Sequence, residues 1–194
     1  AEIKIGARSK YAYFERHVHS PGGGVTVVPK AIVTVGAGAL FRTEFELIKG
    51  RVGAIDIDYE ATCHERSVLD MSARISGRGD DRIKINETAH LVGEYARGVL
   101  TSKIAVRERA VAEVYNKLTA SAAFARGHVD CKEIIQDQGR ATAVPVVDVQ
   151  HPRAHVTHEA AIGSVDSKQL ETLMSRGLSE DEAVEVIIGG MLTR

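Results

Sequence analysis

Alternation between apolar and polar side chains governs the middle of this chain. The segments 41–47, 55–61 and 69–75 each place an apolar residue at nearly every second position, with charged or polar residues between them. A period of two predicts strands with one buried face and one wet face. The apolar runs also begin at a constant spacing of fourteen residues, at Phe41, Ile55, Leu69 and Ile83. Repeated strand-plus-turn units of this kind are typical of a β-solenoid or a β-sandwich.

The joins between the predicted strands favour the solenoid. They are short and polar, as in "IKGRVG" (48–53) and "SGRGDD" (76–81), and they lack the Asn-Gly pairs that sandwich hairpins prefer. Proline and long helical periodicity are both scarce across residues 25–160. We therefore expect a mainly β protein whose strand core covers residues 1–165.

The period changes in residues 166–194, which we expect to form a separate helical segment. Asp166 or Ser167 can cap a first helix, and Gly177 supplies a left-handed stop after it. Ser179 and Glu182 form the capping box of a second helix. The apolar side of this second helix is predicted to comprise Ala183, Val186, Ile187 and Met191.

Composition narrows the possible functions. Hydrophobic residues make up 44% and charged residues 26% of the 194 residues, without any apolar run long enough to span a membrane. The segment "AEIKIGARSK" does not resemble a signal peptide. A net charge of -1 without a basic stripe argues against nucleic acid as a partner. Two cysteines without a CxxC pair favour a reducing, cytoplasmic setting.

Three histidines gather in "HPRAHVTHEAAIGSV" (151–165) and suggest a metal site. A zinc protease needs two histidines one helical turn apart with the glutamate between them, which this strand-like stretch does not provide. In an extended strand His155 and His158 point to opposite faces, so they cannot share one ion. His158 and the adjacent Glu159 remain as ligands that another chain would have to complete, or else as ordinary surface residues.

A second histidine pair, His17 and His19 in "HVHSPGGG", lies on one face of a short predicted strand. This is similar to the HxH of cupins, so a cupin-like metal-dependent β-barrel enzyme is the alternative function. The cupin glutamate expected a few residues later is replaced by "SPGGG", which is typical of a turn. The chain has no P-loop, so any nucleotide hydrolysis must belong to another protein.

Cys131 lies in the predicted strand "ARGHVDCKEII" (125–135), where Val129, Cys131 and Glu133 share a face. A lone cysteine is more often a small core residue than a reactive group. Neighbouring acids would raise its pKa and neighbouring bases would lower it. Cys63, in "YEATCHERS", is predicted to lie in a turn.

The carboxyl-terminal stretch "VTHEAAIGSVDSKQLETLMSRGLSEDEAVEVIIGGML" (156–192) resembles the signature of the SufB/SufD family of iron–sulfur cluster assembly scaffolds. The stretches "RGHVDCKEII", "AVPVVDV" and "LIKGRVG" also resemble this family. The resemblance implies a right-handed parallel β-helix with a short C-terminal helical segment. It also implies a non-enzymatic scaffold that dimerises with itself or with a SufB/SufD paralogue and binds a SufC-type ABC ATPase.

Specific residues follow from the same resemblance. Cys131 is similar to the SufB cysteine that accepts sulfur and holds the nascent cluster, and His158 is similar to the histidine shared by SufB and SufD. Glu159 stands where SufB has glutamate and SufD has glycine, so the chain looks SufB-like. Cys131, His158 and Glu159 are therefore the expected ligands of a transient iron–sulfur cluster, since thiolate, imidazole and carboxylate all bind iron. Only Cys63 is left as a second thiol, which argues against a relay of several cysteines. The expected ATPase-docking residues are Leu170, Leu173, Met174, Arg176, Gly177, Leu178, Glu182, Val186 and Ile187.

Overall fold

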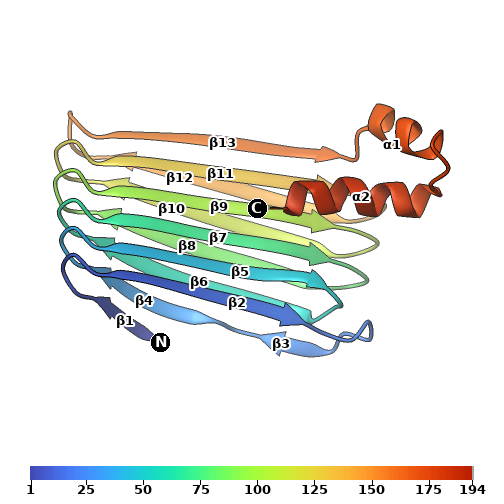
Figure 1. The fold of residues 1–194 in the computed structure, drawn as a ribbon, viewed down its shortest axis with the longest axis horizontal. Coiled ribbons are helices and arrows are strands. Elements are labelled where there is room, and N and C mark those ends of the chain that lie inside the picture. The colour runs from blue at the N-terminus through green and yellow to red at the C-terminus, as the bar shows by residue number, and fades with distance from the viewer. Residues whose placement is uncertain (194) are drawn as a thin grey trace.

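A computed structural model describes residues 1–193, and Arg194, the last residue of the segment 166–194, lies outside the described residues. Strands fill the chain up to Ser164 and two helices follow (Figure 1). The strands are β1 (Glu2–Ile5), β2 (Lys10–Val18), β3 (Val25–Val27), β4 (Lys30–Val35), β5 (Leu40–Lys49), β6 (Gly53–Cys63), β7 (Val68–Gly77), β8 (Arg82–Leu91), β9 (Arg97–Val106), β10 (Val111–Ala120), β11 (Arg126–Ile135), β12 (Arg140–Val149) and β13 (His155–Ser164). The helices are α1 (Ser167–Met174) and α2 (Glu180–Leu192).

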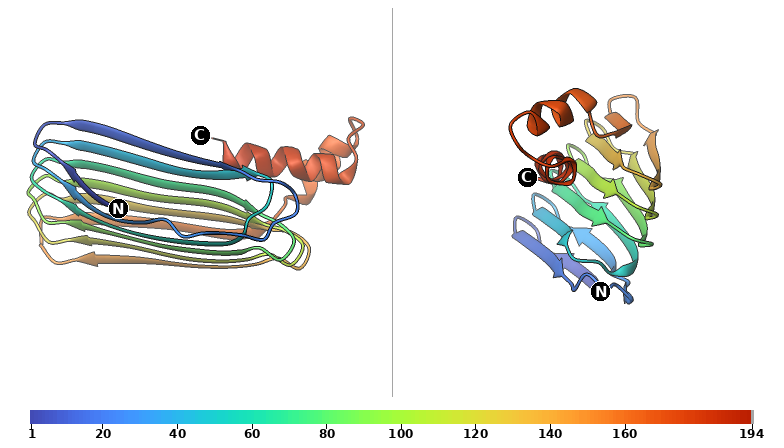
Figure 2. Two further views of the ribbon diagram at one scale, coloured as in Figure 1. Left: turned by 90° about the horizontal axis from the view of Figure 1, so that it is seen from below. Right: turned by 90° about the vertical axis from the view of Figure 1, so that its right-hand side faces the viewer.

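Consecutive strands from β4 onward alternate between two facing parallel sheets. One sheet has the order β1-β4-β6-β8-β10-β12, with β3 beside β6, and the other has the order β13-β11-β9-β7-β5-β2. The chain therefore winds as a flattened coil, and the views along and across it show the sheets facing each other (Figure 2). The predicted parallel β-solenoid with a C-terminal helical segment is confirmed.

One complete coil takes 30 or 31 residues at the start of the chain and 28 or 29 residues in the later coils. Phe41 pairs with Leu69 and Ile55 pairs with Ile83, each 28 residues on, while Leu100 pairs with Val129 after 29. The fourteen-residue repeat of the sequence is therefore half a coil. It steps from one sheet to the other, so strands fourteen apart face each other and do not pair.

Left-handed residues mark the turns at one edge of the coil. Arg66, Tyr95 and Phe124 have φ values of 53°, 59° and 60°, and Gly38 occupies the equivalent position one coil earlier with a φ of 65°. The turns also bond to each other along the stack, since the amide of Arg66 donates to the carbonyl of Glu94 at 2.8 Å. The Tyr95 and Phe124 rings stack at 4.8 Å between centroids.

The inward side chains of both sheets form a single apolar core. Its largest fully buried members include Phe41, Ile57, Met71 and Leu118. Cys63 belongs to this core as the fully buried last residue of β6, so its predicted placement in a turn is wrong. It occupies the inward phase of β6 because the strand continues two residues past Ala61, where the next side chain again points inside.

Helix α2 lies on the outer face of the sheet that contains β7 and β9 (Figures 1 and 2). Its buried residues are Ala183, Val184, Ile188 and Leu192. Of the predicted apolar side, Ala183 is buried and Ile187 and Met191 are partly buried against the same cluster, whereas Val186 is exposed. Apolar residues occur on more than one side of α2, and packing on the solenoid buries Val184, Ile188 and Leu192. No helix among residues 1–193 is long and apolar enough to cross a membrane.

Polar contacts hold the end of α2 against the solenoid. The buried guanidinium of Arg74 donates to the carbonyl of Leu192 at 2.6 Å and also pairs with Glu44 and Glu46. Nearer the start of the helix, Glu185 accepts hydrogen bonds from Arg78 and Arg107. As expected, Asp166 caps α1, the Ser179–Glu182 capping box begins α2, and Gly177 between the helices has a φ of +97°.

Candidate metal and cluster site

Cys131 and His158 occupy the inner face of the last two coils on one sheet. Cys131 is at the middle of β11 and fully buried, and its partner on β13 is Ala160. His158 pairs with the buried Val129, so the pleat directs both side chains to the same side as Cys131. Strand spacing and rise place the Cβ atoms of Cys131 and His158 about 8 Å apart. Cys131 and His158 therefore lie on adjacent coils of the same sheet and on the same face.

Glu159 lies on the opposite, outer face of β13. It pairs with Asp130, and one of its carboxylate oxygens lies 3.9 Å from the ammonium nitrogen of Lys132. Lys132 also donates to Asp130 at 3.2 Å, so an outer cluster of two acids and one base forms beside the strand. The chain therefore directs Cys131 and His158 inward and Glu159 outward.

The last coil ends without a covering strand among the described residues. β13 pairs only with β11, and β12 pairs only with β10. As a consequence, the inward side chains of β13 are open to solvent: His158 and Ala160 are exposed, and Ile162 retains 47% of its accessible surface. Cys131 is thus one coil below an open end, and the small side chain of Ala160 stands over it.

Polar groups surround Cys131 inside the solenoid. The Asn116 amide nitrogen lies 3.8 Å from the cysteine Sγ and 3.5 Å from the hydroxyl of Ser102. Asn116 and Ser102 are fully buried, and they come from the strands that face and precede β11. A thiol in this setting has hydrogen-bond donors close to its sulfur.

Burial is the main cause of the raised pKa of the Cys131 thiol, and the nearby acids, with Glu133 first among them, add to it. A hydrogen bond with Ser102 acts in the opposite direction. Burial also raises the pKa of Cys63 to about 12. Both thiols are therefore protonated at neutral pH in this conformation, and a soft cation would have to displace the proton of Cys131 to bind it.

Two glutamates share the interior with Cys131. Glu133, two residues along β11, and Glu87 on β8 are each only 2% exposed. Burial raises the pKa of Glu133 to about 7 and that of Glu87 to about 8. Neither oxygen of Glu133 has a hydrogen-bond partner within residues 1–193, and the same holds for Oε2 of Glu87 and Oδ1 of Asn116.

Sequence reasoning placed Glu133 on the Cys131 face but gave it no role, and it missed Glu87. The signal was available, because Glu87 occupies the inward phase of "RIKINETAHL", between Ile85 and Ala89. A charged residue on the apolar phase of an alternating strand indicates either a strand end or a buried functional group.

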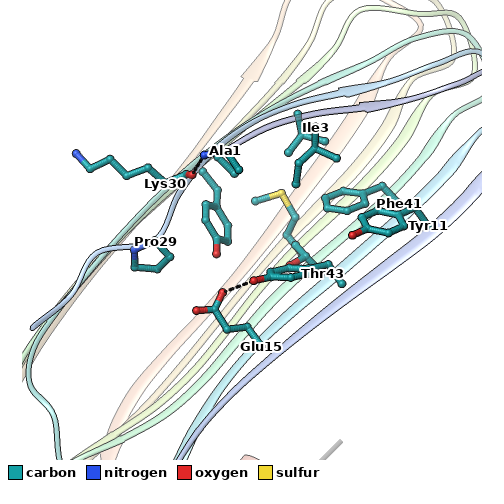
Figure 3. A pocket seen from close by; sticks show the side chains of 13 residues that line it. Ala1, Ile3, Tyr11, Glu15, Pro29, Lys30, Phe41 and Thr43 are labelled. Atoms are coloured by element: carbon teal, nitrogen blue, oxygen red, sulfur yellow. Dashed lines mark hydrogen bonds between the residues drawn. The ribbon is translucent and has the colours of Figure 1, made fainter. Parts of the chain in front are cut away.

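The other end of the solenoid holds the second histidine pair. His17 Nδ1 lies 3.3 Å from His19 Nε2, and His17 Nε2 lies 2.7 Å from a carboxylate oxygen of Glu15. A cupin barrel is antiparallel, whereas these residues end a parallel solenoid, so the cupin-like alternative is wrong in its fold. A cavity of about 440 Å³ opens beside them, lined by Tyr11, Phe41 and Glu15 among others (Figure 3).

A groove of about 550 Å³ lies between the two helices and the end of β11. Ile134, Leu173, Val186 and Ile187 contribute apolar side chains to it. Val186 is 52% exposed, so the helical segment keeps an apolar surface after α2 has packed on the solenoid.

The remaining expected docking residues have other positions. Met174 and Arg176 are exposed at the end of α1, while Leu170 and Leu178 are partly buried. Gly177 and Glu182 form the connection between the helices and the cap of α2, so their visible role is structural.

The residues on the inner face around Cys131 do not form a complete metal site. No three Cys, His, Asp or Glu side chains of residues 1–193 converge closely enough to hold a metal ion. The thiol, the imidazole and the unpartnered carboxylate oxygens are nevertheless ligand types that iron accepts. A bound cation would satisfy the buried carboxylate oxygens of Glu133 and Glu87 that lack a hydrogen-bond partner among the described residues.

Comparison with known proteins agrees with this chemistry. The family model of the SUF system FeS cluster assembly, SufBD core domain, matches residues 2–191. An iron–sulfur cluster assembly SufBD family protein of Methanocaldococcus jannaschii is 39% identical over 190 residues, which is 98% of this chain and 60% of the relative. A SufBD family protein of Pyrococcus horikoshii is 35% identical over 98% of this chain and 58% of its own length.

A more distant relative carries a more specific name. The iron–sulfur cluster assembly protein SufB of Bacillus subtilis is 26% identical over 130 residues, which is 64% of this chain and 27% of that protein. The chain spans about 60% of the length of the Methanocaldococcus jannaschii and Pyrococcus horikoshii relatives. The family model and these relatives together show that the chain belongs to the SufBD family of iron–sulfur cluster assembly proteins.

Proposed function

We propose that this chain is a non-catalytic scaffold that holds a nascent iron–sulfur cluster transiently at the open end of its solenoid. The observation that carries the proposal is the position of Cys131, one coil below that end, with His158 on the next coil of the same face. A site with few protein ligands suits a scaffold, because four cysteines would retain the cluster too firmly for transfer.

A second subunit would complete the site. The outer edge of β13 has no partner strand among residues 1–193, and Glu159 is exposed beside it. A homodimer, or a heterodimer with a SufB/SufD paralogue, would cover this end and add ligands across the interface. Glu159, on the outer face, would then act at the interface and Cys131 on the inside.

Anaerobic reconstitution with ferrous iron and sulfide tests this function. Cys131→Ser should abolish the visible absorption of a cluster while far-ultraviolet circular dichroism stays unchanged, and His158→Ala and Glu159→Gln should each reduce the yield. The control is Cys63→Ser, which removes the other thiol from the far coils. A normal cluster yield in Cys131→Ser would disprove the proposal.

We also infer that the groove between α1, α2 and Ile134 is where a SufC-type ABC ATPase docks. The chain has no P-loop of its own, and the groove presents apolar residues beside an acidic helix start. Ile187→Asp should abolish co-purification with the ATPase. Val144→Asp is the matched control, because Val144 is a 43% exposed apolar residue on the outer face of β12. Equal ATPase recovery with both variants would count against docking in the groove.

A further inference from the structure

Glu133 is a buried carboxyl group beside Cys131 that the proposed function does not use. It follows Cys131 by two residues on β11, so both side chains leave the strand on its inner face. It is 2% exposed, and both of its carboxylate oxygens lack hydrogen-bond partners within the described part of the chain. A carboxyl group buried without partners costs several kcal/mol, so folding alone gives no reason for it.

From this geometry we propose that Glu133, together with Cys131, forms the inner chelate that binds ferrous iron within one protomer. The inference rests on the proposed function and names a ligand that the family resemblance does not assign. Glu159 contributes from the other face of the sheet and does not belong to this chelate.

The separation suits a chelate. Two residues along a strand place the Cβ atoms of Cys131 and Glu133 about 7 Å apart. Metal–sulfur and metal–oxygen bonds of about 2.3 and 2.1 Å, added to the two side chains, span that gap with one ion between them. Ligation would satisfy the orphaned carboxylate oxygens, and the nearby Asn116 amide and Ser102 hydroxyl remain available to stabilise the thiolate.

The route to this chelate starts at the open end of the solenoid. Ala160 stands over Cys131, and Ile162 stands over Glu133. Ile162 is 47% exposed, so a single layer of side chains on β13 separates the chelate from solvent. An ion that passes this layer reaches Cys131 and Glu133 with His158 at the rim.

Cobalt(II) tests the proposal, because it substitutes for ferrous iron and a thiolate ligand gives it a charge-transfer band in the near ultraviolet. The protein, reduced and free of metal, is titrated with Co(II) under anaerobic conditions. Glu133→Gln should weaken binding by about tenfold or more and shift the visible ligand-field bands, because even an outer partner of a metal ligand costs that much. The control Glu113→Gln, at an exposed glutamate on β10 outside the site, should bind Co(II) as the wild type does.

The two proposals fail in different ways. Loss of the band in Cys131→Ser, but an unchanged titration in Glu133→Gln, would overturn the Glu133 assignment and leave the scaffold function standing. An unchanged band in Cys131→Ser would instead overturn the scaffold site itself. Glutamine keeps the shape of glutamate and serine that of cysteine. Circular dichroism and urea unfolding should therefore show that Glu133→Gln and Cys131→Ser are both folded. If Glu133→Gln unfolds, Glu133→Asp replaces it, with weakened Co(II) binding expected and wild-type binding refuting the assignment.

Discussion

Glu87 gives the solenoid a pH dependence that a single substitution should remove. Its side chain is 2% exposed on the inner face of β8, next to Tyr59 and Asn116 on the flanking strands. Burial raises the pKa of Glu87 to about 8, while the unfolded chain keeps it near 4.5. The folded state therefore binds one more proton than the unfolded state between these values, and stability must fall as the pH rises through this window.

The size of the effect follows from the two pKa values. Each pH unit within the window changes the free energy of unfolding by about 1.4 kcal/mol. From pH 5 to pH 8 the Glu87 contribution should therefore fall by about 3–4 kcal/mol, a large part of a domain stability of roughly 5–15 kcal/mol. Glu87→Gln removes the titration but keeps the shape of the side chain. The buried amide adds a constant cost of about 1–3 kcal/mol, which does not vary with pH.

Urea unfolding of wild type and Glu87→Gln at pH 5, 6, 7 and 8 measures this difference. The variant should gain stability relative to the wild type by about 3–4 kcal/mol across the series, whichever protein is more stable at pH 5. Glu113→Gln is the control, since Glu113 is exposed on the neighbouring strand β10. Parallel profiles for wild type and Glu87→Gln would refute the reasoning, because they would mean that Glu87 titrates alike in both states.

Two further predictions concern the core. At pH 7.5, Cys63 and Cys131 should react with an aromatic disulfide reagent far more slowly in the native protein than in urea. The reason is that burial raises the pKa of both thiols and blocks access of the reagent. Fast labelling of either thiol in the native state would contradict this burial. Gly127→Ala should lower the free energy of unfolding by about 1–3 kcal/mol in urea titrations, because the new Cβ would lie 2.4 Å from a Leu118 methyl carbon. Gly163→Ala, where no atom lies within 4 Å of the new Cβ, should stay within about 0.5 kcal/mol of wild type, and equal losses in both variants would exclude overpacking as the cause.

Much of the candidate site could be read from the chain before the fold was known. The family motif singled out Cys131, His158 and Glu159, and strand alternation put Cys131 and Glu133 on one face. Alternation puts Glu159 and His158 on opposite faces of their strand, but it leaves open which of the two faces is the inside. That face is chosen by pairing with β11, where His158 aligns with the buried Val129.

For the helices, too, the local sequence predicted some features, and only packing decided the others. Caps are local, since a serine and a glutamate three residues apart bond to each other's backbone whatever the rest of the chain does, and Ser179 and Glu182 were predicted correctly. The buried side of α2 is not local. Apolar residues occur on more than one of its sides, and contact with Ala105 and the anchor from Arg74 decided that Ile188 faces the solenoid and Val186 does not.

The sequence alone determined the alternating strands that begin near Phe41, Ile55 and Leu69, the two helices and their caps, because alternation and capping act within a few residues. Only the tertiary structure decided that the fourteen-residue repeat is half a coil, since strand pairing joins residues 28 to 31 apart. Stacking of those coils also determined that Glu87 and Glu133 are inside and that Cys131 is one coil from the open end. Burial depends on what lies above and across a strand, and those neighbours come from other coils of the chain.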